Sequence, residues 1–166
     1  MRVLALSALA MLALVGAGTT NGHAHAPIAL DIVRPVSPSV RVNEAAALVA
    51  DINVVRLSAG LGSLAVDDRL SRAALHHARD MASRNYFGHE SPDGRSLIDR
   101  LGDVGFTWHV AAENIALNSD ETHAHQALLD SPGHRANMLD PRVRLVGVAA
   151  LNVGQGSTLY VEDFAL

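Results

Sequence analysis

The 166-residue chain contains no cysteine. It can therefore form no disulfide, carry no lipid on a cysteine at a processing site, and use no cysteine nucleophile. All 13 basic residues are arginine, and no cluster of them could neutralise a row of phosphates, so nucleic acid is not an expected partner. The sequence also lacks the H-E-x-x-H, G-x-S-x-G, P-loop and G-x-G-x-x-G motifs, and with them the signatures of several enzyme classes.

No hydrophobic run is long enough to cross a bilayer comfortably. The longest apolar stretch, residues 3–15, follows Arg2 and precedes Ala24-His25-Ala26, which offers the small residues of a cleavage site. This pattern predicts a signal peptide over residues 1–26, an exported protein and no transmembrane anchor after cleavage. The remaining 140 residues (166 minus 26) are enough for one domain with its own core.

Residues 27–42 have the composition of a linker, with three prolines and little periodicity. From Asn43, which we expect to cap a first helix, an apolar stripe with helical spacing begins, so the domain is predicted to cover residues 43–166. Asp67 or Asp68 is expected to cap a second helix that ends near Arg84.

The second half of the chain changes from helical to strand-like patterns. Short helices are predicted over residues 96–101 and 120–129, with an extended segment over residues 111–117 between them. Residues 143–153 and 158–164 have the pattern of two strands around the turn at residues 154–156. Helices followed by strands predict an α+β domain in which helices cover a small sheet.

Three short segments place an imidazole or a carboxylate beside turn or cap chemistry. His89 follows Gly88 in a loop rich in turn residues, and Glu113 lies among apolar neighbours. Ser131-Pro132 is typical of a helix start, which puts His134 in the first turn, where the helix dipole favours a neutral imidazole. Together His89, Glu113 and His134 could hold one divalent metal ion or polarise one water.

Each of these residues also has a structural interpretation. His134 could serve only to fix its turn through a hydrogen bond to backbone, and a loop histidine such as His89 is ordinarily solvated. Glu113 could be a partner in a buried ion pair, for example with Arg135 or Arg100. His77 lies on the buried stripe of the second helix and is expected to be a satisfied core residue.

The chain resembles the CAP family (cysteine-rich secretory proteins, antigen 5, pathogenesis-related 1) in its short bacterial form. The resemblance covers about residues 48–164 and rests on segments that follow the family's order: Asn53-Val54-Val55-Arg56, Gly60-Leu61, His77-Ala78-Arg79-Asp80-Met81, Tyr86-Phe87-Gly88-His89, Glu113-Asn114-Ile115-Ala116, Ser131-Pro132-Gly133-His134-Arg135 and Glu162-Asp163-Phe164.

This resemblance implies a three-layer α-β-α sandwich, an extracellular location, and a site of two histidines and two acidic residues that takes zinc or another divalent ion. The family's first histidine falls on His89, its first glutamate on Glu113 and its second histidine on His134. The second acidic position falls on Ser131, so this chain keeps three of the four residues. The family's cysteines are absent as well.

Three functions are compatible with this pattern. The first is an extracellular binding module that holds a metal, a lipid-like small molecule or a cell-envelope component. The second is a metal-dependent hydrolase that uses the His/Glu/His site, and the third is a structural protein of the cell envelope. We favour the non-enzymatic binding module, because one missing acid weakens catalysis more than it weakens binding.

Overall fold

The computed structural model describes residues 37–166, so the predicted signal peptide and most of the predicted linker lie outside the described residues. The described elements follow the order β1 (Ser39–Val40), α1 (Val42–Ser58), β2 (Ala65–Val66), α2 (Asp68–Arg84), α3 (Leu97–Asp103), β3 (Ala111–Asn118), α4 (Glu121–Asp130), α5 (Pro132–Met138), β4 (Leu145–Gly154) and β5 (Ser157–Ala165). The last residues of the predicted linker thus form β1.

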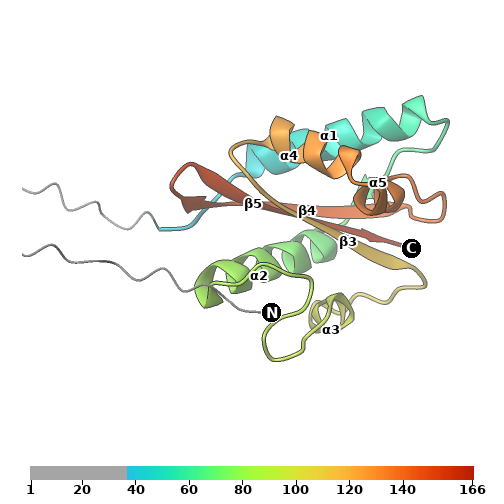
Figure 1. Ribbon diagram of the computed structural model, residues 1–166. Coiled ribbons are helices and arrows are strands. Elements are labelled where there is room, and N and C mark those ends of the chain that lie inside the picture. The colour runs from blue at the N-terminus through green and yellow to red at the C-terminus, as the bar shows by residue number, and fades with distance from the viewer. Residues whose placement is uncertain (1–36) are drawn as a thin grey trace, which may run out of the picture. The chain divides into compact units, whose positions relative to one another are not determined.

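One sheet of five strands lies at the centre of this unit. Its order is β1-β4-β5-β3, and β2 adds to the same edge of β4 as β1 does. The three long strands are antiparallel, whereas the short β2 runs parallel to β4. Helices α1, α4 and α5 lie on one face and α2 and α3 on the other (Figure 1). The predicted α+β fold, a three-layer sandwich, is confirmed.

Local signals account for the ends of the second helix. The side chain of Asp67 accepts hydrogen bonds from the backbone N–H groups of Arg69 and Leu70, as an N-cap does. At the other end Asn85 adopts the left-handed conformation, with φ 53°, and stops the helix. The cap predicted at Asn43 is wrong, because α1 already begins at Val42 and Arg41 occupies the cap position without a side-chain bond.

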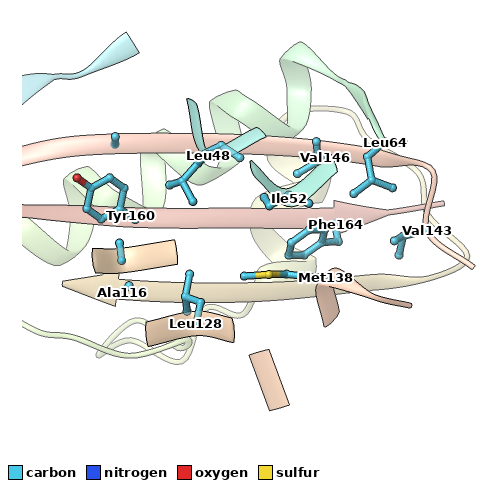
Figure 2. Packing of buried hydrophobic residues seen from close by; sticks show 13 residues of the cluster. Leu48, Ile52, Leu64, Ala116, Leu128, Met138, Val143, Val146, Tyr160 and Phe164 are labelled. Atoms are coloured by element: carbon cyan, nitrogen blue, oxygen red, sulfur yellow. The ribbon is translucent and has the colours of Figure 1, made fainter. Parts of the chain in front are cut away.

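The largest apolar cluster lies between the sheet and α1, α4 and α5. Figure 2 shows Leu48 and Ile52 of α1 packed against Tyr160 and Phe164 of β5, all fully buried. A second cluster fills the space between the sheet and α2. There Gly147 allows a close approach: a Cβ at this position would lie 2.2 Å from the backbone of Leu70 and Ser71. Helix α2 therefore packs directly on β4.

A buried arginine joins the first helix to the segment that carries α5. Arg56, only 1% exposed, donates hydrogen bonds to the carbonyl groups of Gly62, Met138 and Asp140. Because these carbonyls lie in loops and at a helix end, the guanidinium replaces backbone partners that regular structure would otherwise supply. The end of α5 is thereby fixed relative to α1.

Candidate functional site

The candidate site is built around Glu113 on β3. Its side chain is 3% exposed and points toward the face of the sheet that α2 and α3 cover. Oε1 lies 2.9 Å from His89 Nδ1, while Oε2 lies 2.7 Å from His77 Nδ1 and 2.8 Å from Arg100 Nη2. One carboxylate therefore joins a helix, a loop and a second helix that are far apart in sequence.

These contacts keep Glu113 ionised. Burial alone would raise its pKa, but the hydrogen bonds from His77 and His89 and the positive charge of Arg100 outweigh burial and lower the pKa to about 2. Of the two alternatives for Glu113, the buried ion pair is realised, and its partner is Arg100 rather than Arg135.

The loop that carries His89 is held at both ends of its turn. The Tyr86 hydroxyl donates to Asp80 Oδ2 at 2.6 Å and contacts Ser91 Oγ at 3.0 Å, which ties the loop to α2. Arg100 also donates to the backbone carbonyl of His89. The imidazole itself remains half exposed, and its hydrogen bond to Glu113 raises its pKa. His89 is thus fixed at Nδ1 and open to solvent on its other side.

His134 reaches the same end of β3 from the opposite direction. Asn114 Nδ2 donates to the His134 carbonyl at 3.1 Å, and Asn137 of α5 donates to Asn114 Oδ1 at 2.9 Å. Two amide side chains therefore attach the short helix α5 to β3. Burial and then the nearby charge of His89 lower the pKa of His134, so the neutral imidazole expected from the sequence is favoured.

A second buried acid lies beside Glu113 on the neighbouring strand. Asp163 of β5 pairs in register with Glu113 and is 1% exposed, yet neither of its carboxyl oxygens has a hydrogen-bond partner in the described part of the chain. Burial and the negative charge of Glu113 raise its pKa well above the ordinary value. Burial and the ionised neighbour therefore both favour the neutral form of Asp163.

The structure brings His89 into direct contact with Glu113 and places His134 close enough for the two imidazole charges to interact. Within residues 37–166, however, no group of three or more histidine, aspartate or glutamate side chains is arranged to hold a metal ion. A site with His89, Glu113 and His134 as three ligands stays a prediction.

The donor set gives a test of whether a metal ion fits here. Glu113 already accepts three hydrogen bonds and is almost fully buried, which is the environment of a supporting carboxylate. It fits as the carboxylate that orients a ligating histidine: Nδ1–H of His89 donates to Glu113, which leaves Nε2 free to coordinate. The neutral His134 is the second candidate ligand.

Sequence reasoning missed part of this arrangement. His77 was expected to be a satisfied core residue, and it is fully buried, but its contact is the site carboxylate and its Nε2 has no partner within the described chain. Its place on an apolar stripe was the available signal, because a buried imidazole requires a polar partner. Asp163, Glu162 and Asn137 carried no comparable signal, since only the strand register and the position of α5 bring them near the site.

The comparisons with known proteins agree with this fold. The family model described as "CAP: Cysteine-rich secretory protein family" matches residues 49–164. The chain belongs to the CAP family. Its sequence is 35% identical over 113 residues to the uncharacterized protein YkwD of Bacillus subtilis, an alignment that covers 68% of this chain and 43% of YkwD.

Solved structures show the same domain. An extracellular protein with an SCP domain from Bacillus anthracis is similar with a TM-score of 0.68 and 33% identity, over 75% of this chain and 40% of that chain. The structure of NaASP2 with Zn²⁺ shares the fold alone, with a TM-score of 0.52 and 17% identity, over 73% of this chain and 78% of that chain.

The chain spans less than half the length of YkwD and of the Bacillus anthracis protein. Within residues 37–166, no helix combines the length and the apolar character that a membrane span requires.

Proposed function

We propose that this CAP domain is an exported, non-enzymatic binding module that holds a divalent metal ion, zinc before others, between His89 and His134. The observation that carries the proposal is the hydrogen bond between His89 Nδ1 and the ionised Glu113. A carboxylate behind a ligating histidine fixes its tautomer and makes it a better ligand. Bound there, zinc would supply a Lewis acid that accepts a further ligand in its open positions.

The remaining groups of the site support this role by positioning the two imidazoles. Arg100 holds both the carboxylate of Glu113 and the backbone of His89, and the amides of Asn114 and Asn137 hold the backbone of His134. The Zn²⁺ in the structure of NaASP2, which shares the fold, is consistent with the proposal.

Glu113, the acid in contact with His89, is poorly placed to act as the general base of a hydrolase. Both oxygens of Glu113 accept hydrogen bonds from cationic or imidazole groups, so neither is placed to take a proton from water. Asp130, at the end of α4, accepts a hydrogen bond from Gln126 on its own helix. These contacts favour binding over catalysis.

Calorimetric titration with zinc tests the proposal. The double variant His89→Ala, His134→Ala is compared with His76→Ala, His109→Ala, which removes two exposed histidines outside the site and leaves the same total number. We expect the first variant to bind zinc at least about tenfold more weakly than the wild type and the second to bind as the wild type does. Equal binding by all three proteins would contradict the proposal.

A further inference from the structure

One edge of the sheet is open for a short distance in the middle of β4. On this edge β2 pairs with β4 up to Val146, and β1 pairs from Leu151 onward. Both short strands run toward the gap, and the chain then turns away from the sheet into α1 and α2. Residues 147–150 of β4 therefore have no strand partner on this side within residues 37–166.

The backbone of Val148 faces this gap. On either side of it, the carbonyls of Val146 and Ala150 accept hydrogen bonds from the backbone N–H groups of Asp67 and Arg41, at 3.0 and 2.8 Å. Alternate residues of a strand direct their N–H and C=O groups to the same edge, so those of Val148 point between the two bonds. Within residues 37–166, no backbone hydrogen bond from β1, β2 or a neighbouring loop reaches Val148 on this edge.

A groove of about 690 Å³ lies over the gap. Its walls come from α1 and α2, where small and apolar side chains such as Ala46, Val49 and Leu75 line it, and Val148 lies on its floor. Three valines at its margins are unusually exposed: Val40 by 41%, Val42 by 69% and Val66 by 56%. An apolar groove with unpaired backbone groups on its floor suits a ligand that has both apolar groups and backbone hydrogen-bond donors and acceptors.

We propose that this groove binds an extended, uncharged peptide segment of a partner protein, which adds a short strand to β4 between β1 and β2. A peptide supplies the N–H and C=O that Val148 needs, together with small apolar side chains for the walls. An acyl chain could fill the volume but would leave both backbone groups of Val148 buried and unpaired, which is costly. Between the paired carbonyls of Val146 and Ala150, β4 spans about 13 Å of extended chain.

Charge at the groove agrees with an uncharged segment. Asp68 and Arg72 line it with one charge of each sign, and neither forms an ion pair within residues 37–166. Because these two charges are of opposite sign, the groove favours a ligand without net charge. None of the groove residues belongs to the histidine site, so this inference does not depend on metal binding.

The test uses the capped peptide acetyl-Ala-Val-Ala-Val-Ala-amide as the probe for the purified full-length chain. Binding is measured by calorimetry, and hydrogen exchange of the Val148 amide is followed by NMR in the same samples. Ala46→Glu places a charged side chain in the groove from an exposed helix position, and Val54→Glu adds the same charge at an exposed α1 position outside it. A probe methylated at its central amide nitrogen removes one hydrogen-bond donor.

We expect the probe to slow exchange of the Val148 amide at least about tenfold and to bind Ala46→Glu at least about tenfold more weakly than Val54→Glu. The methylated probe should bind more weakly than the parent. Unchanged exchange of the Val148 amide at saturating probe, or equal binding by the two variants, would overturn the proposal. The proposal would also be overturned if the peptide fails to bind while the protein binds palmitate, or forms a dimer, in a way that Ala46→Glu abolishes.

Discussion

Two buried glutamates on opposite faces of the sheet show how differently the same side chain behaves. Glu113 of β3 faces α2 and α3, and three donors surround it. Glu162 of β5 faces the apolar cluster of Figure 2 and accepts one hydrogen bond, from Asn114 Nδ2 at 2.9 Å. The pKa of Glu113 is lowered to about 2, whereas burial raises the pKa of Glu162 to about 7.

Partners rather than burial decide the charge of each acid. Glu162 is fully buried, and one neutral amide does not compensate for the lost hydration of a carboxylate. Glu113 is nearly as buried, but Arg100 and two imidazoles replace its hydration. The face with Glu113 is therefore the one on which a carboxylate orients His89 for coordination.

The largest expected effect comes from removing the charge of Glu113. Glu113→Gln keeps the shape but leaves the guanidinium of Arg100 buried without a counter-charge, which should lower the free energy of unfolding at pH 7 by about 3–5 kcal/mol. Urea denaturation measures this loss, with Glu90→Gln, an exposed acid, as the control. A loss below about 1 kcal/mol would show that the ion pair contributes little.

Replacing Glu162 is expected to change the free energy of unfolding in the opposite direction, toward greater stability. Its pKa is raised in the folded protein, so the folded state binds more protons, and the unfavourable contribution of Glu162 grows as pH rises from about 4.5 to about 7. Glu162→Gln removes this ionisation and should raise the free energy of unfolding at pH 8 by up to about 3 kcal/mol, with little change at pH 4. Urea denaturation at both pH values tests this, and equal effects at pH 4 and pH 8 would contradict it.

The pH dependence of Glu113 runs the other way. Its lowered pKa means that the stabilisation is present above about pH 4.5 and is lost as pH falls toward 2. The destabilisation by Glu113→Gln should therefore shrink in acid. In a pair of pH series, Glu162→Gln is expected to approach the wild type as pH falls from about 7 to about 4.5, and Glu113→Gln only as pH falls further, from about 4.5 toward 2.

The smallest effect is expected from the amides that attach α5 to β3. Asn137→Ala removes the bond to Asn114 Oδ1 and should cost about 1 kcal/mol of unfolding free energy. Because α5 carries His134, zinc affinity measured by calorimetry should fall by about tenfold. Asn43→Ala, at an exposed asparagine, is the control. Equal zinc affinities of the two variants would show that this attachment of α5 does not help to position the metal site.

Much of the fold could be predicted because its signals are local. Asp67 and Asp120 cap helices through their own side chains, and Ser96 forms a capping box with Asp99. The turn at residues 154–156 has positive φ at all three positions, two of which are glycines. The two-residue strands β1 and β2 gave no pattern, since two residues show no alternation. They form because their backbones pair with the edge of β4.

The site was less predictable than the fold, because it depends on contacts between segments that are far apart in the sequence. Motif spacing pointed to His89, Glu113 and His134, but the role of each depends on contacts made across the sheet. Strand register places Asp163 beside Glu113, and the packing of α2 brings His77 to the same carboxylate. Neither relation leaves a trace in local composition. The sequence therefore left Glu113 as either a metal ligand or a buried ion-pair partner, and the structure gives it the contacts of a supporting group.

The central claim is that Glu113 holds His89 through Nδ1 and leaves Nε2 free for a metal ion. Long-range ¹⁵N–¹H NMR of the histidine side chains reports the tautomer of each ring directly, at a pH high enough for His89 to be neutral. We expect His89 to carry its proton on Nδ1 and added zinc to shift its Nε2 resonance. A neutral His89 protonated on Nε2, or an Nε2 resonance unmoved by saturating zinc, would contradict it.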